Sequence, residues 1–253
     1  MLIPEIALYI IIFLYGLCIG SFLNVCIYRI PKNENIAVVR SHCLKCGYNL
    51  KWYDNIPLLS YICLKGRCRS CKAHISLQYP IIEAVNAVLY VLIFMIHGIS
   101  VESGIYCLAF SAFIVLSVID ERTYEIPLGI NIFILALGLI HLGLDFKSWL
   151  HYVIGLFSVS IVLAIIYYVS NGRAIGGGDV KLMAATGLLF GWKINILGFV
   201  LGCILGSVIH IIRMRVSKAE NVLAMGPYLA AGVALAALYG DKFIVWYLNL
   251  LGI

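Results

Sequence analysis

Two short cysteine motifs carry residue types and a spacing that are typical of metal binding. They are Cys43-Leu-Lys-Cys46 and Cys68-Arg-Ser-Cys71. Two such pairs about 20 residues apart have the spacing of a four-thiolate zinc site, in which each pair occupies one tight turn. Glycines at 47 and 66 would allow these turns. Four protein ligands leave no open position for water, so the predicted zinc is structural.

The same four cysteines could instead form disulfides. Neighbouring basic residues favour thiolates, and these are Lys45, Arg67, Arg69 and Lys72. The orientation derived below places the motifs on the cytoplasmic side, where thiols stay reduced. We therefore favour zinc. Cys63 fits the ligand spacing less well, and we expect His42 and His74 to be exposed polar residues rather than ligands.

Two aspartates stand at the edges of apolar runs, where an ionisable group is costly. Asp120 closes one run, and Asp179 follows the glycines of Gly176-Gly-Gly-Asp179 and opens another. Two carboxyl groups on separate helices can share a proton, because their like charges push their proton affinities apart. The ionised group can then draw a proton from water while the protonated group polarises a peptide carbonyl, which is aspartic-protease chemistry. Alternatively, both aspartates cap helices or pair with Arg122 and Lys181.

Four further residues are candidates for binding substrate or cofactor. Gly176 and Gly178 permit close approach of a backbone, from either a substrate or a neighbouring helix. Lys181 lies near enough in sequence to meet the substrate. Glu83 is the most suggestive of the remaining acids and is predicted to bind a cofactor, although its place at a helix start equally suits a cap. No serine-hydrolase elbow, nucleotide-binding loop or zinc-protease motif is present.

The composition indicates which elements must position these residues. Of the 253 residues, 63% are hydrophobic and 12% are charged, against about 45–50% and 25% in soluble domains. With a mean hydropathy of +1.02, soluble, disordered and disulfide-scaffold classes are excluded. We predict an all-α polytopic membrane bundle with about eight transmembrane helices. Their apolar runs lie at 5–28, 80–97, 104–119, 126–144, 149–169, 179–192, 194–212 and 222–240.

The distribution of cations orients this bundle. If the N-terminus lies outside, only Lys147, Lys193 and Lys242 of the 18 Lys and Arg residues lie outside, and the others, from Arg29 to Lys218, lie inside. The positive-inside rule therefore places both termini outside. The net charge of +6 follows from this topology and needs no nucleic-acid partner. One inside loop, 29–79, is long and holds the cysteine motifs.

Six segments in this order resemble the type IV prepilin peptidases, which are membrane aspartyl proteases of the G-x-G-D type. They are Gly20-Ser-Phe-Leu-Asn-Val25, the pair of cysteine motifs counted as one, Tyr79-Pro-Ile-Ile-Glu83, Asp120 before Ile126-Pro127, Gly176-Gly-Gly-Asp179, and Met225-Gly-Pro-Tyr-Leu-Ala230. One departure is Leu128, where the family often has Asp or Asn directly after Ile-Pro; Asn131 lies further on.

The resemblance implies an enzyme that removes the basic leader of prepilins or pseudopilins at the cytoplasmic face of the bacterial inner membrane. Asp120 and Asp179 would be catalytic, and Cys43, Cys46, Cys68 and Cys71 would hold zinc. Relatives with the cysteine loop usually also N-methylate the new N-terminus with S-adenosylmethionine. We predict a first transmembrane helix (1–28), a cytoplasmic zinc-ribbon-like loop (29–79) and a transmembrane peptidase bundle (80–253). The alternative is a non-enzymatic transporter or assembly scaffold in the bilayer, with a zinc-binding loop.

Overall fold

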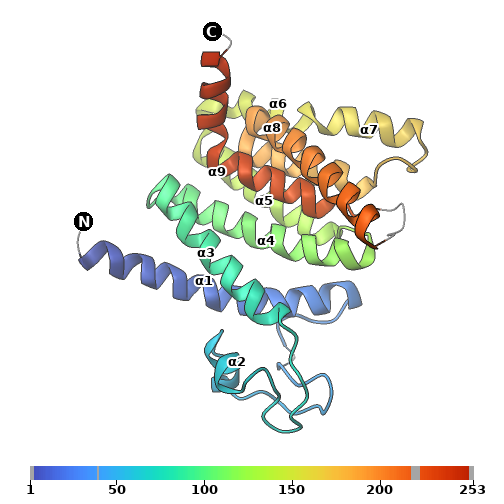
Figure 1. Cartoon of the computed structure of the whole chain (residues 1–253). Coiled ribbons are helices and arrows are strands. Elements are labelled where there is room, and N and C mark those ends of the chain that lie inside the picture. The colour runs from blue at the N-terminus through green and yellow to red at the C-terminus, as the bar shows by residue number, and fades with distance from the viewer. Residues whose placement is uncertain (1–2, 39, 218–222, 251–253) are drawn as a thin grey trace. The chain divides into compact units, whose positions relative to one another are not determined.

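The computed structural model describes residues 3–38, 40–217 and 223–250, and over these residues the protein is helical (Figure 1). Its α-helices are α1 (Ile3–Arg29), α2 (Leu59–Cys63), α3 (Gln78–His97), α4 (Val101–Thr123), α5 (Leu128–Leu144), α6 (Trp149–Ser158), α7 (Ser160–Val169), α8 (Gly177–Ser217) and α9 (Gly226–Leu250). Short 3₁₀ helices lie at Ile30–Lys32, Trp52–Asn55 and Phe146–Ser148. The prediction of an all-α fold is confirmed.

Six helical segments among the described residues are long and apolar enough to cross a membrane. They are Glu5–Lys32, Gln78–His97, Val101–Thr123, Phe146–Val169, Gly177–Val216 and Gly226–Tyr247, and Leu128–Leu144 is a shorter apolar helix. These segments overlap the predicted runs, two of which fall within Gly177–Val216, so the chain is a multi-pass membrane protein, whereas the number of eight membrane helices stays a prediction. Lys218 and the predicted start of the last run at residue 222 lie outside the described residues.

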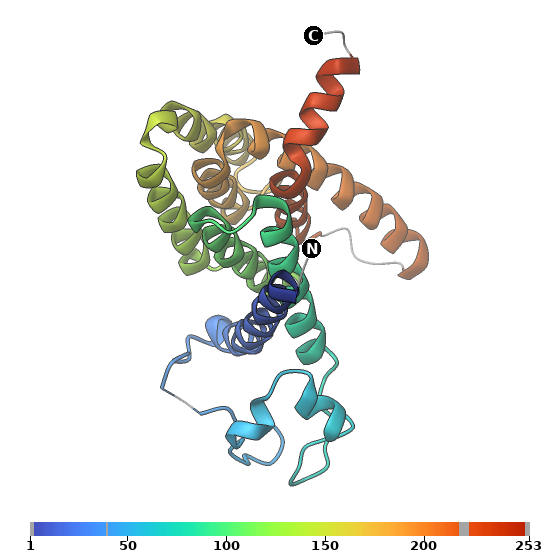
Figure 2. The same cartoon turned by 90° about the vertical axis from the view of Figure 1, so that its left-hand side faces the viewer.

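Helix α8 contains a break that separates the runs predicted at 179–192 and 194–212. Gly191 has φ 79° and ψ 171°, and a Cβ atom there would collide with the imidazole of His151. Figure 2 shows the two parts of α8 pointing in different directions. Near the break, the carbonyl of Leu189 lies 2.8 Å from Nδ1 of buried His141. The carbonyl of Leu189, close to the break, therefore has the His141 side chain as a hydrogen-bond partner.

The run predicted at 149–169 consists of two helices, α6 and α7, that meet at Val159. A serine stands on each side of the junction. The hydroxyl of Ser158 donates to the carbonyl of Gly155 over 2.9 Å, and the hydroxyl of Ser160 donates to the carbonyl of Leu156. Such bonds to the preceding turn are known to bend helices.

The chain divides into two compact units, residues 1–115 and 116–253. In the first unit, α1 and α3 lie side by side along a seam of small residues. A Cβ atom at Gly16 would lie 2.7 Å from Cα of Ala87, and one at Gly20 would lie 2.7 Å from Cα of Glu83. Beside this seam, the buried side chain of Asn86 donates to the carbonyl of Gly16 over 2.8 Å. Gly16 and Gly20, one helical turn apart, thus let α1 and α3 cross closely.

In the second unit, α8 packs against α5, α6, α7 and α9. Glycines again permit close crossing, because a Cβ atom at Gly187 would meet the backbone of Gly155 on α6. Beside that crossing, the fully buried amide of Asn195 accepts a hydrogen bond from Thr186 over 2.9 Å and donates to the carbonyl of Met183 over 3.0 Å. The unit is therefore held by helix contacts and buried hydrogen bonds.

We predict that Gly16→Ala destabilises the protein, because the added methyl group meets the backbone of Ala87. Overpacking of this kind costs about 1–3 kcal/mol. Gly143→Ala is the matched control, since nothing lies within 4 Å of a Cβ atom at that position. Thermal unfolding in detergent measures both variants. Equal midpoints for the two would show that the seam does not stabilise the fold.

Candidate functional site

The four cysteines predicted as zinc ligands come together in the first unit. Their sulfur atoms all lie within 4.8 Å of one another, and Sγ of Cys43 is 3.9 Å from Sγ of Cys71. A tetrahedral zinc with Zn–S bonds of about 2.3 Å places its sulfurs about 3.8 Å apart. The cysteines are free thiols, so the disulfide alternative does not describe this structure. The four side chains fit a closed, structural zinc site.

The two cysteine turns share one backbone pattern. In the first, the N–H of Cys43 donates to the carbonyl of Tyr48 over 2.9 Å, and the N–H of Gly47 donates back to the carbonyl of Cys43 over 2.9 Å. In the second, the N–H of Cys68 donates to the carbonyl of Ala73 over 2.8 Å, and that of Lys72 donates to the carbonyl of Cys68 over 3.1 Å. Each motif therefore presents its two sulfurs from the same kind of turn.

The expected role of one glycine in these turns is wrong. Gly47 has φ 71°, as expected, but the equivalent left-handed position in the second turn is Lys72, with φ 58°. Gly66 also has a positive φ, yet it precedes the motif, and a Cβ atom there would lie 2.8 Å from the hydroxyl of Tyr61. Gly66 thus packs the end of α2 rather than shaping the second cysteine turn.

The thiols of Cys43 and Cys71 differ in pKa. Backbone N–H groups of Cys46 and Lys45 lower the pKa of the Cys43 thiol to about 6. Although the Ala73 N–H opposes it, burial and the neighbouring thiols raise the pKa of Cys71 to about 11. Adjacent sulfurs cannot all ionise unless a cation offsets their charge. His42 and His74 are exposed and lie outside the cluster, as expected.

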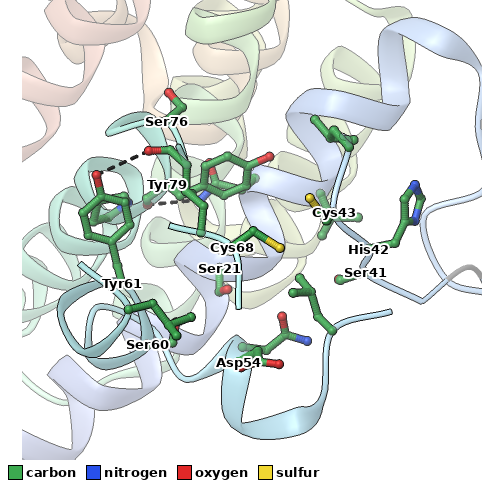
Figure 3. Close-up of a pocket in the computed structure, with 18 of the residues that line it drawn as sticks. Ser21, Ser41, His42, Cys43, Asp54, Ser60, Tyr61, Cys68, Ser76 and Tyr79 are labelled. Carbon is green, nitrogen blue, oxygen red and sulfur yellow. Dashed lines mark hydrogen bonds between the residues drawn. The ribbon is translucent and has the colours of Figure 1, made fainter. Parts of the chain in front are cut away.

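A pocket of about 390 Å³ lies between α1, the cysteine loop and the start of α3. Figure 3 shows Tyr61 and Tyr79 on one side of it and Cys43 on the other, with Asp54 at its lower edge. Its size is within the range of small-molecule sites. The predicted cofactor residue, Glu83, belongs to its lining. The pocket thus brings Glu83 near two of the predicted metal ligands.

Two acidic groups of this pocket have defined partners. Oε2 of Glu83 accepts a hydrogen bond of 2.9 Å from the N–H of Leu58, which ties the cysteine loop to α3. Oδ1 of Asp54 accepts one of 2.8 Å from Nε of Arg69, so these residues form an ion pair in which the aspartate is buried. The lining therefore holds carboxylates in fixed positions.

The two predicted catalytic aspartates lie in the second unit. Asp120 is in the last turns of α4 and only 4% exposed, and Asp179 is in the first turn of α8. Their carboxylates are near enough to interact electrostatically. The backbone N–H of Gly226, at the start of α9, donates to Oδ2 of Asp120 over 2.9 Å. The structure thus brings together the two carboxyl groups that the sequence singled out.

Small residues make room for this arrangement. A Cβ atom at Gly176 would lie 3.2 Å from Oδ2 of Asp179, and one at Gly178 would lie 3.0 Å from Cβ of Ile126. A Cβ atom at Gly226 would lie 3.2 Å from Cδ1 of the same isoleucine. Ile126 therefore packs between Gly178, which precedes Asp179, and Gly226, whose N–H donates to Asp120. Lys181, the other predicted substrate residue, is exposed on α8.

The sequence did not assign roles to Gly226 and Asn131. Gly226 bonds to Asp120 across 106 residues of chain, and its only signal was the Gly-Pro-Tyr segment. Nδ2 of Asn131, on α5, donates to the carbonyl of Gly178 over 3.3 Å. Its Oδ1 is buried and has no hydrogen-bond partner in the described part of the chain. The starts of α5, α8 and α9 and the end of α4 thus meet around the carboxyl pair.

The cysteine cluster yields a test of metal binding. We predict that the double variant Cys43→Ser with Cys46→Ser loses the bound zinc, because two of the four ligands are removed. Elemental mass spectrometry of the purified protein measures the zinc content. Cys63→Ser is the control, since Cys63 is exposed in the same loop and lies outside the cluster. Unchanged zinc in the double variant would refute the four-cysteine site.

Two models of protein families match the chain. One, described as the bacterial peptidase A24 N-terminal domain, matches residues 14–97, and the other, described as the type IV leader peptidase family, matches residues 107–211. The first match contains the cysteine cluster and the pocket, and the second contains Asp120 and Asp179. No solved structure matches.

Two bacterial proteins that are similar to this chain over most of their length have the same name. The chain is 32% identical to the prepilin leader peptidase/N-methyltransferase of Pseudomonas aeruginosa, over 94% of this chain and 93% of that protein. It is 34% identical to the protein of the same name from Bacillus subtilis, over 95% of this chain and 98% of that protein. The chain therefore belongs to the type IV leader peptidase family of enzymes.

Proposed function

We propose that this enzyme cleaves the leader peptide of type IV prepilins or pseudopilins with Asp120 and Asp179 as its catalytic pair. The observation that carries the proposal is that Ile126 contacts both Gly178, beside Asp179, and Gly226, whose N–H donates to Asp120. The names of the relatives, prepilin leader peptidase/N-methyltransferase, support the choice of substrate.

The chemistry follows from two carboxyl groups in one site. Like charges favour a state in which one group is ionised and the other protonated. The ionised aspartate takes a proton from water, which attacks the peptide carbonyl carbon, while the protonated aspartate donates to the carbonyl oxygen. The tetrahedral intermediate then collapses as a proton passes to the leaving amine. The hydrogen bond from Gly226 holds the Asp120 carboxylate in one orientation for these steps.

The residues around the pair are proposed to receive the substrate. Gly176 and Gly178 carry no side chain that would block a peptide backbone near Asp179. Lys181 is exposed beside them and would contact the substrate chain. A prepilin carries a basic leader and then an apolar helix, so this helix would lie in the bilayer with the scissile bond at the depth of the aspartates.

Orientation in the membrane is part of the same proposal. The cations concentrate on the segments that hold the cysteine loop and the two aspartates. With the N-terminus outside, these segments face the cytoplasm across a bacterial inner membrane. The basic leader would then stay in the cytoplasm during cleavage. The division into 1–28, 29–79 and 80–253 also stays a prediction.

For methylation, we propose the pocket of the first unit as the site of S-adenosylmethionine. Its lining fits such a ligand, since Glu83 supplies a carboxylate for a positive group and Tyr61 and Tyr79 supply aromatic surface. When bound, S-adenosylmethionine supplies the methyl group. Glu83 would hold the ligand in orientation, and the zinc site would keep Cys43 and its turn in place along the pocket wall.

We predict that Asp120→Asn and Asp179→Asn each lower leader cleavage about a thousandfold or more, because the site then lacks one of its two carboxyl groups. Mass spectrometry of a purified prepilin incubated with the enzyme in nanodiscs measures cleavage. Asp241→Asn, an exposed position on α9, should cleave normally. Full cleavage by either active-site variant would overturn the catalytic pair.

We predict that Glu83→Gln impairs methylation and spares cleavage. Losing a hydrogen bond to a charged group should weaken S-adenosylmethionine binding about ten- to a hundredfold. Calorimetry measures the binding, and transfer to a peptide that is already cut measures methylation independently of the peptidase. Glu34→Gln, an exposed loop position, is the control. Normal affinity in Glu83→Gln would place the cofactor elsewhere.

A further inference from the structure

Helix α2 presents an apolar face that the described residues leave uncovered. Leu59 and Ile62 are 60% and 68% exposed. They are three residues apart and therefore share one side of the helix. Tyr61, between them, belongs to the lining of the pocket (Figure 3). Leu59 and Ile62 thus give this short helix one apolar side that no other described residue covers.

The start of α2 lies level with the membrane-spanning helices rather than beyond their ends. The N–H of Leu58 bonds to Glu83, which lies inside the span Gln78–His97. Glu83 in turn packs on Gly20. At 1.5 Å per residue, Gly20 lies about 13 Å along the axis before the end of α1. The start of α2 therefore lies beside the membrane-spanning helices, close to the end of α3 that joins the cysteine loop.

The charges next to α2 are positive. Lys65 and Arg67 follow the helix and are exposed. The acids of the loop 29–79 are Glu34 and Asp54, and Asp54 is buried in its ion pair with Arg69. Exposed cations beside an apolar face suit the negative surface of a bilayer that contains anionic lipid. The same cations would repel a basic leader peptide, which argues against the substrate as the occupant of this face.

We infer that α2 is a membrane-interface anchor: Leu59 and Ile62 enter the acyl chains of the leaflet on the side of the cysteine loop, while Lys65 and Arg67 bind anionic lipid headgroups. The anchor holds the cysteine loop and its pocket against the bilayer surface. This inference does not depend on the peptidase or methyltransferase activity proposed above, so its test stands apart from theirs.

A photocrosslinker placed at Ile62 identifies what contacts this face. Benzoylphenylalanine replaces Ile62 in the full chain, which is reconstituted in nanodiscs of phosphatidylcholine with or without phosphatidylglycerol. After illumination, mass spectrometry reports the adducts. We expect lipid adducts several-fold above those of the same probe at Val38, which is 78% exposed in the same loop. We also expect enrichment of phosphatidylglycerol over its share of the bilayer.

A double variant tests whether the charges of Lys65 and Arg67 bind anionic lipid. Lys65→Glu with Arg67→Glu should abolish the enrichment of phosphatidylglycerol adducts, whereas Lys242→Glu, near the C-terminus, should retain it. Lipid adducts at position 62 no more frequent than at Val38 would overturn the anchor. Crosslinks to a second copy of the chain, or to added prepilin in place of lipid, would also overturn it and would assign α2 to an interface between proteins.

Discussion

The interior of a bilayer offers no water, so each polar group placed there must find its partner within the protein. This constraint explains the place of one buried polar side chain in each unit. In the first unit, Asn86 bonds to the carbonyl of Gly16 and accepts from Ser111 over 2.8 Å. In the second, buried Asp120 accepts the N–H of Gly226. Asn86 thus lies where α1 and α3 cross closely. Asp120 lies where the start of α9 supplies an N–H group that the turns of α9 do not use.

The two sites of the protein differ in the elements that position their residues. The carboxyl pair is built from the ends of membrane helices, whose positions are set by the packing of α8 against its neighbours. The cysteine cluster is built from two local turns in a loop with little apolar core, and its four sulfurs need a cation to offset their charge. The bond between Glu83 and Leu58 is where the loop is joined to the membrane helices, and the pocket lies at that junction.

Much of this arrangement can be predicted from the sequence because it depends on local pattern. The apolar runs predict the spans, and the spacing of Cys43, Cys46, Cys68 and Cys71 predicts the cluster. Contacts between segments that are far apart in the sequence leave no such local pattern, so they could not be predicted. The bond from Gly226 to Asp120 spans 106 residues, and nothing in the spacing indicates that Leu58 meets Glu83. The left-handed backbone of Lys72 was also missed, because a lysine rarely adopts it.

The seam between α1 and α3 has a consequence for biosynthesis. Gly16 and Gly20 are made well before Ala87 and Glu83, the residues that fill the space beside them. Chain elongation runs at about 5–20 residues per second, so the partner helix arrives several seconds later. During that interval α1 lies in the membrane with its glycine face open to any other small-residue helix. The close contacts of this seam can therefore form only after α3 has been synthesised.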